Sequence, residues 1–312
     1  MIDILLPTMG RIGFLFLLIG AGWLLSIIGV LPKGSSTVLA KLENTLFVPA
    51  LVMSTFMRYF TPSRIISAWK TLLVGTITLV AFLPLALIFA RICGKEDYSR
   101  KIYTYGLAFS NFGFMGNAVI DALYPGYFLD YLIFTLPFWM LIYLWGVPTL
   151  LIPGSKKSIG SRLKALFNPM FVGMLIGIIL GLTGLSLPGF VSSAVSVAAD
   201  CMSPIAMLLT GVTVAGMRFG EAFGKIGVWV ASLIRLLLFP VMAIIALIFI
   251  PLSPVLEVCI VAVLAMPLGL NTIVVPAAYG KNVTVATSMA LLSHLLSVLT
   301  IPVVFWMMGQ IL

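Results

Sequence analysis

Two short tracts combine asparagine with helix-breaking residues and are the parts of the sequence best suited to hold a ligand. The first, 110–117, reads SNFGFMGN, and the second, 266–272, reads MPLGLNT. Gly and Pro weaken a helix locally, so each tract is expected to interrupt one. An asparagine at such a break can replace a lost backbone partner or turn its amide donors toward a ligand. The candidate binding residues are Asn111, Asn117, Asn271, Gly113, Gly116, Pro267 and Thr272.

Four ionisable residues lie within long apolar segments: Asp121, Asp200, Arg235 and His294. Charged groups are costly in lipid and often mark a functional site there. Asp121, Asp200 and His294 are candidates for binding a coupling proton or sodium ion, and Arg235 is a candidate counter-charge for an anion. Two structural alternatives stay open. Arg235 could pair with an acid such as Asp200, and His294 could be a neutral, hydrogen-bonded packing residue.

Other reactive groups are sparse. The single histidine excludes a two-histidine metal site and an HExxH zinc protease. The chain contains no P-loop pattern, and nothing resembles the GxSxG motif that would support a serine–histidine pair. The three cysteines form no CxxC pair. We therefore expect neither an enzyme nor a metal or other cofactor, apart from a possible coupling ion.

The composition requires these residues to be positioned by membrane-spanning elements. Of 312 residues, 62% are hydrophobic and 9% are charged, whereas soluble globular proteins are about 25% charged. Too few polar side chains remain to cover a water-facing surface, which excludes a soluble enzyme, a nucleic-acid-binding domain and a disordered protein. Long apolar runs that do not alternate favour helices over a barrel.

Apolar runs separated by Gly, Pro or charge predict ten spanning helices of about 20 residues each. Their predicted ranges are 10–31, 38–58, 66–91, 101–124, 128–152, 168–186, 190–216, 226–250, 254–279 and 284–311. Ten spans place both termini on one side, which receives only Arg11, Arg58, Arg64 and Lys70. The opposite side receives thirteen Lys and Arg residues, and Arg235 falls inside a span. The positive-inside rule then puts both termini outside the cell, and the net charge of +9 is an orientation signal that indicates no nucleic-acid partner.

The two halves of the chain share landmarks at a nearly fixed offset. The matched pairs are Pro32 and Pro188, Pro49 and Pro204, Pro84 and Pro240, Asn117 and Asn271, and Gly126 and Gly280, at offsets of 154 to 156 residues. Five landmarks in the same order predict a duplication, with five spans in 1–152, a linker at 153–167 and five spans in 168–312. An odd number of spans inverts the second copy, as in secondary transporters with a site at the repeat interface.

Several tracts resemble the auxin efflux carrier family of the bile acid, arsenite and riboflavin transporter superfamily. The tract LAMPLGLNTIVVPAAYG at 264–280 is similar to the ninth helix of that family, and NTLFVPALVMSTF at 44–56 to its second. SNFGFMG at 110–116 resembles the fourth-helix crossover, and the tract at 167–190 the sixth helix. The short 153–167 loop resembles bacterial members, and Ala118 and Thr272 stand where plant members carry a proline.

The resemblance implies two inverted five-helix repeats in which broken helices 4 and 9 cross beside the substrate. Helices 1, 2, 6 and 7 would form a scaffold and homodimer interface, and helices 3–5 and 8–10 a mobile transport domain. Family substrates are organic anions such as auxin, malate or malonate. The sequence therefore predicts a cell-membrane carrier for a small organic anion, working by an elevator movement. The alternatives are a channel or membrane subunit of a larger complex, and an intramembrane enzyme.

Overall fold

Apolar runs fold into helices throughout the computed structural model, which describes residues 2–153, 160, 167–216, 224–269, 271–278 and 281–312. Within these ranges the backbone forms no strand, and an isolated bridge joins Ser110 to Leu268. A helix satisfies its backbone groups within its own segment, which suits a chain with little polar surface. The predicted all-helical class is confirmed, while most of the 153–167 linker lies outside the described residues.

Helix occurs in each of the ten predicted ranges. In chain order the elements are α1 (Ile2–Ile27), α2 (Ser35–Leu42), η1 (Glu43–Phe47), α3 (Val48–Tyr59), η2 (Pro62–Arg64), α4 (Ile65–Cys93), α5 (Asp97–Ala108), η3 (Phe112–Gly116), α6 (Asn117–Leu123), η4 (Pro125–Tyr127), α7 (Phe128–Leu141), η5 (Ile142–Leu151), α9 (Pro169–Thr183), α10 (Gly189–Asp200), α11 (Met202–Ala215), α13 (Ile226–Leu233), η6 (Ile234–Leu238), α14 (Phe239–Phe249), α15 (Pro254–Ala265), α16 (Asn271–Ala278) and α17 (Thr284–Ile311).

Five helical stretches among the described residues are long and apolar enough to cross a membrane: Ser67–Cys93, Pro125–Leu151, Gly189–Ala215, Ile226–Phe249 and Thr284–Ile311. Four shorter apolar helices accompany them: Phe16–Ile27, Phe112–Leu123, Pro169–Thr183 and Pro254–Ala265. Two of the shorter ones, Phe112–Leu123 and Pro254–Ala265, adjoin the predicted interruptions. These lengths and compositions are those of a multi-pass membrane protein.

Prolines lie in or beside three of the wide, π-helical turns. The turn η1 ends two residues before Pro49, η6 ends two residues before Pro240, and η5 contains Pro148. Proline lacks the N–H that an α-helix needs, and its ring crowds the carbonyl four residues earlier. A π-turn changes the hydrogen-bonding register at that point, so the helix bulges and continues.

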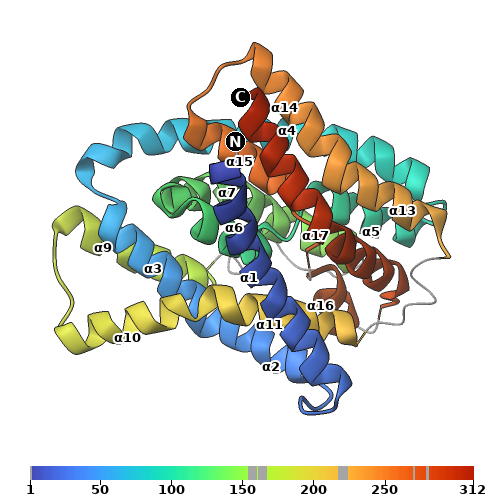
Figure 1. Ribbon diagram of the computed structural model, residues 1–312, viewed down its shortest axis with the longest axis horizontal. Coiled ribbons are helices and arrows are strands. Elements are labelled where there is room, and N and C mark those ends of the chain that lie inside the picture. Colours follow the sequence, from blue (N-terminus) through green and yellow to red (C-terminus); the bar gives the residue numbers. More distant parts are fainter. Residues whose placement is uncertain (1, 154–159, 161–166, 217–223, 270, 279–280) are drawn as a thin grey trace.

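The helices form two groups by their contacts, and Figure 1 shows α3, α9 and α10 of the first group together at one side of the molecule. In the first group, α1 packs along α11, α3 packs along α9, and α10 packs on α3. Close approach explains glycines in these contacts: a Cβ on Gly211 would meet the backbone of Ile19, and one on Gly173 the backbone of Pro49. The first group comprises α1, α2, η1, α3, α9, α10 and α11.

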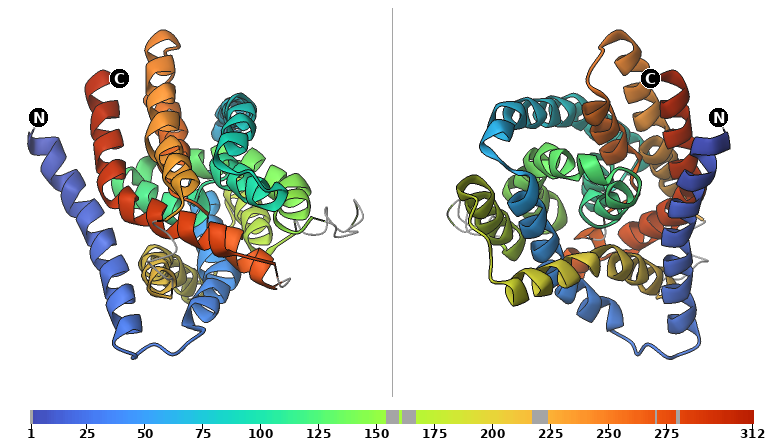
Figure 2. Two further views of the ribbon diagram at one scale, coloured as in Figure 1. Left: turned by 90° about the vertical axis from the view of Figure 1, so that its right-hand side faces the viewer. Right: turned by 60° about the vertical axis from the view of Figure 1, so that its left-hand side comes forward.

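The second group contains the two predicted helix breaks. Here α4 packs on α5 and α7, α14 on α15, and α13 on α17. The chain is non-helical at residues 109–111 and 266–269, so both predicted interruptions are present. The helix α6 also contacts α1 and α11 of the first group. Both termini lie at one end of the molecule, and the α1–α2 turn lies at the other (Figure 2).

Candidate binding site at the crossing helix breaks

The two breaks cross and are joined by main-chain contacts. The Asn111 N–H donates to Pro267 O over 2.7 Å, and the Ser110 hydroxyl donates to Val263 O over 2.7 Å. The bridge between Ser110 and Leu268 runs antiparallel at the same point. These bonds use backbone groups that the broken helices leave unpaired, so the crossover has a defined geometry inside an apolar core.

A small cavity lies at the crossover and has a volume of about 20 Å³, enough for one water-sized group. Both breaks contribute to it, together with α5, α7 and η5. It is lined by Tyr105, Ser110, Asn111, Phe112, Gly113, Phe114, Trp139, Ile142, Gly269 and Asn271. Polar groups from two distant parts of the sequence therefore converge on one space.

Two helix N-termini also face this space. Helix resumes at Phe112 after the first break and at Asn271 after the second, and residues at both starts line the cavity. The first N–H groups of a helix have no partner within it and carry partial positive charge. Such ends attract anions.

Asn111 lines the cavity and contacts His294 on α17. The amide Nδ2 lies 3.3 Å from His294 Nε2, and His294 Nδ1 lies 2.8 Å from Ala290 O. Asn111 is 2% exposed and His294 is 5% exposed. The sequence offered His294 as an ion site or as a packing residue, and the structure places it directly behind a cavity-lining amide.

Asn271 also lines the cavity, and its side chain shares a hydrogen bond with the Tyr105 hydroxyl. Trp139 packs its ring against Gly113, which has no room for a Cβ atom at that place. Neither aromatic residue was singled out from the sequence. Their spacing is that of ordinary core aromatics, and only the fold brings them to the breaks.

The other candidate binding residues shape the bends. The Asn117 amide donates to Gly113 O over 2.7 Å, and the Thr272 hydroxyl donates to Gly269 O over 2.5 Å. A Cβ on Gly116 would meet the Tyr131 hydroxyl, which itself donates to Phe112 O over 3.1 Å. The Asn117 amide thus supplies Gly113 O with a hydrogen-bond donor at the bend.

Arg235 holds both broken helices and is 1% exposed. Its Nη1 donates to Leu107 O over 2.9 Å, its Nε donates to Met266 O over 3.2 Å, and its Nη2 donates to Val263 O. These carbonyls belong to the C-terminal ends of α5 and α15. Among the described residues Arg235 has no acidic partner, so the suggested pair with Asp200 is absent.

Asp121 and Asp200 lie at the boundary between the two groups of helices. Asp121 on α6 accepts a hydrogen bond from the Ser203 hydroxyl on α11 over 3.3 Å. Asp200 ends α10 and lies close enough to repel the Asp121 carboxylate. The two acids are therefore near each other but away from the residues that line the cavity.

Glu43 is a buried acid that the sequence did not mark as a candidate. It lies in η1, is 0% exposed, and neither carboxylate oxygen has a hydrogen-bond partner among the described residues. Its signal in the sequence is its place in an apolar span, close to the end of that span. A single acid in such a place is readily assigned to the membrane interface.

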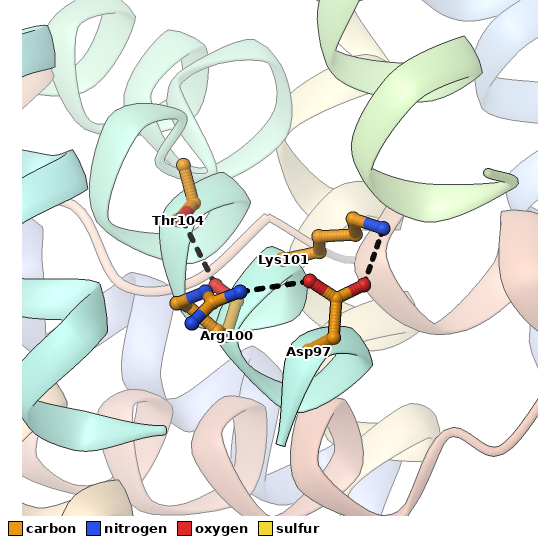
Figure 3. Close-up of polar contacts among 4 residues, drawn as sticks. All are labelled: Asp97, Arg100, Lys101 and Thr104. Atoms are coloured by element: carbon orange, nitrogen blue, oxygen red, sulfur yellow. Dashed lines mark hydrogen bonds and ion pairs between the residues drawn. The ribbon is translucent and has the colours of Figure 1, made fainter. Parts of the chain in front are cut away.

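The start of α5 is fixed by an ionic cluster outside the apolar core. Figure 3 shows Asp97 between Lys101 and Arg100, at 2.6 Å and 2.8 Å. Hydrogen bonding and attraction to Lys101, helped by Arg100, lower the pKa of the Asp97 carboxyl. An acid in the first turn also favours the helix dipole. This cluster anchors the helix whose other end reaches the first break.

The comparisons with known proteins identify the family of the chain. A family model described as "Membrane transport protein" matches residues 7–305. No curated protein matches the chain. The family match covers nearly the whole sequence and confirms the resemblance noted from its motifs. The chain therefore belongs to this family of membrane transport proteins, the auxin efflux carrier family, whose members are transporters and not enzymes.

Proposed function

We propose that this protein is a secondary transporter that carries a small organic anion, a carboxylate, across the cell membrane. The observation that carries the proposal is the cavity at the crossover, where two helix N-termini meet the amides of Asn111 and Asn271. A carboxylate accepts hydrogen bonds, and backbone N–H groups, the Asn271 amide and helix dipoles supply donors without a fixed cation. Tyr105 adds a hydroxyl at the same place.

The anion would be bound by uncharged hydrogen-bond donors. None of the cavity-lining residues is basic, and the guanidinium of Arg235 is engaged with three carbonyls. Arg235 therefore acts on the helix ends and not on the anion. A dicarboxylate is larger than the space of about 20 Å³ that remains. Its binding requires lining side chains such as Trp139 to move apart.

Elevator-type alternating access is part of the proposal. The first group of helices would be the scaffold and homodimer interface, and the second would carry the site across. Helix pairing supports an inverted repeat: α1 packs on α11, and α3 packs on α9. Among the ten predicted spans, the first pair joins span one to span seven and the second pair joins span two to span six. Spans one and two of the first copy correspond to spans six and seven of the second, so the two pairs are equivalent contacts of an inverted repeat. Both termini would face outward.

Coupling to a cation is needed only for accumulation of the anion. An inside-negative potential opposes entry of an anion by about 2.3 kcal/mol per charge per 100 mV. Asp121 and Asp200 lie where the two groups of helices meet, so a proton or sodium ion bound there would sense their relative movement. If Asp121→Asn leaves the proton and sodium dependence of transport unchanged, that acid is not the coupling site.

A binding experiment tests the proposed site. Purified protein would be titrated with malate, malonate and indole-3-acetate by calorimetry, beside Asn271→Ala and the control Asn168→Ala. Asn168 caps α9 and lies outside the cavity. Loss of a hydrogen bond to a charged group weakens binding by about 1.5–3 kcal/mol, or roughly 10- to 150-fold in Kd.

We expect at least one carboxylate to bind, Asn271→Ala to weaken it by that factor, and Asn168→Ala to leave it near the wild-type value. Equal effects of the two variants would remove Asn271 from the site. Failure of all three carboxylates to bind would overturn the assignment of an organic anion.

A further inference from the structure

The contacts of His294 fix which of its ring nitrogens carries hydrogen. Nδ1 faces Ala290 O at 2.8 Å, and a carbonyl can only accept, so Nδ1 is the donor. In a neutral ring Nε2 then carries no hydrogen and accepts. Its neighbour is Asn111 Nδ2, a donor, at 3.3 Å. The arrangement is that of a neutral imidazole.

This contact sets the orientation of the Asn111 amide. Because the NH₂ group faces His294, the oxygen Oδ1 lies in the same plane but on the other side of the Cβ–Cγ bond. The main chain of Asn111 cannot turn, since its N–H donates to Pro267 O and its carbonyl accepts from Gly116 N–H over 2.9 Å. Rotation about the Cβ–Cγ bond exchanges the two ends of the amide without moving the main chain.

We propose that protonation of His294 turns the Asn111 amide and so makes proton binding and anion binding favour each other. A proton taken from water onto Nε2 makes that atom a donor facing a second donor. Turning the amide by about half a revolution lets Oδ1 accept from Nε2–H and places NH₂ on the cavity side. His294 is thus a positioning residue that acts through Asn111. The inference rests on the proposed function.

The surroundings of His294 make protonation of its ring depend on binding of the anion. The titratable groups described on elements packed against α17 and nearest the core are Tyr103 and Tyr105 of α5, Arg235 of η6, and Glu257 and Cys259 of α15. Tyr105 is bonded to Asn271 and Arg235 to three carbonyls. A buried charge without a partner is costly. A carboxylate bound at Asn111 supplies the missing negative charge.

The coupling is reciprocal. If the anion strengthens proton binding, the proton must strengthen anion binding by the same factor. One proton entering with a dicarboxylate leaves one net negative charge to cross instead of two. That lowers the opposing electrical work by about 2.3 kcal/mol at 100 mV.

Proton uptake on binding tests the inference directly. Malate, malonate and indole-3-acetate would be titrated at pH 7.5, where their carboxyl groups are ionised, in two buffers of different ionisation enthalpy. His294→Gln keeps a side-chain acceptor without a titratable group. Ser297→Ala is the matched control, because the Ser297 hydroxyl donates to His294 O and does not reach the ring.

We expect wild type and Ser297→Ala to take up protons as the anion binds, and His294→Gln to take up none. Between pH 7 and 8 the wild-type Kd should rise with pH, since proton uptake is linked to binding, while that of His294→Gln stays flat. Equal proton uptake in wild type and His294→Gln would overturn the inference. So would uptake that persists in Asn111→Ala. Failure of wild type to bind any of the three anions would instead overturn the proposed function.

Discussion

Two asparagines that match at the repeat offset have different surroundings. Asn271 begins α16 and lines the cavity, whereas Asn117 begins α6 one turn behind the cavity and donates to Gly113 O. The difference arises because helix resumes earlier after the first break, at Phe112, through the π-turn η3. Asn111 therefore lines the cavity together with Asn271. Repetition in the sequence predicted that both positions matter, but the length of each break decides how.

Asn117→Ala separates the structural role from binding. The variant leaves Gly113 O without its side-chain partner in a buried place, which costs about 1–3 kcal/mol of unfolding free energy. Thermal melts should show this loss, while the carboxylate Kd of the folded protein stays within about threefold of wild type. Asn117→Asp should be less stable than Asn117→Ala, because it buries a charge. A large rise in Kd with unchanged stability would place Asn117 in the site.

Gly116→Ala tests the packing beneath the first break. The added Cβ meets the Tyr131 hydroxyl, so we expect a loss of about 1–3 kcal/mol from overpacking. Tyr131→Phe removes that oxygen, and in its background Gly116→Ala should cost markedly less. Additive losses in the double mutant, measured by denaturant unfolding, would show that the two groups do not meet.

At the scale of elements, the two broken helices share one arrangement of dipoles. The C-terminal ends of α5 and α15 present carbonyls to Arg235, and the helices that follow the breaks present N-termini to the cavity. A cation is stabilised at the first pair of ends and an anion at the second. Arg235 thereby holds the ends together without being a ligand for the anion.

Arg235→Lys and Arg235→Met test this clamp. A lysine retains the charge but cannot span three carbonyls from a planar fork, so it should be less stable than wild type. Methionine leaves buried carbonyls unpaired, so its loss should be larger, at least about 2 kcal/mol. Thermal unfolding of the two variants gives the order. Stability equal to wild type, together with weakened anion binding, would instead make Arg235 a counter-charge.

The order of the helices and the position of both breaks could be predicted, because apolar runs and the Gly and Pro at 110–117 and 266–272 act locally. The ends were less accurate: α1 ends at Ile27 rather than residue 31, where Gly29 takes a positive φ of 78°. The roles of Arg235, Tyr105 and Glu43 depend on contacts over more than one hundred residues or on burial between helices. The spacing of apolar residues along the sequence predicts neither these long-range contacts nor this burial.

At the scale of the whole molecule, the two groups of helices meet where α6 and α17 contact α1 and α11, where η3 contacts α11, and where α7 contacts α3. The hydrogen bond from Ser203 to Asp121 crosses this boundary. Relative movement of the groups would break that contact, whereas the crossover and Arg235 lie within the second group and would travel together. The proposed movement therefore leaves the anion site intact.

Orientation can be measured with single cysteines on a background from which Cys93, Cys201 and Cys259 are removed. Lys33→Cys and Lys281→Cys should react with an impermeant reagent only from the cytoplasmic side, and Gly126→Cys and Ser253→Cys only from outside. All four positions are exposed, so access does not depend on unfolding. Labelling of Lys33→Cys from outside would reverse the assigned orientation.

The central claim is that this chain alone carries an organic anion through the crossover. The most direct measurement is uptake of radiolabelled malate, malonate and indole-3-acetate into liposomes containing only the purified protein, with and without the unlabelled anion inside. We predict saturable uptake of at least one anion, accelerated by the same anion in the lumen and strongly reduced in Asn111→Ala and Asn271→Ala. The account would be contradicted by a flux that rises linearly with the external anion concentration and does not change with the anion in the lumen. The absence of flux in well-folded protein would also contradict it.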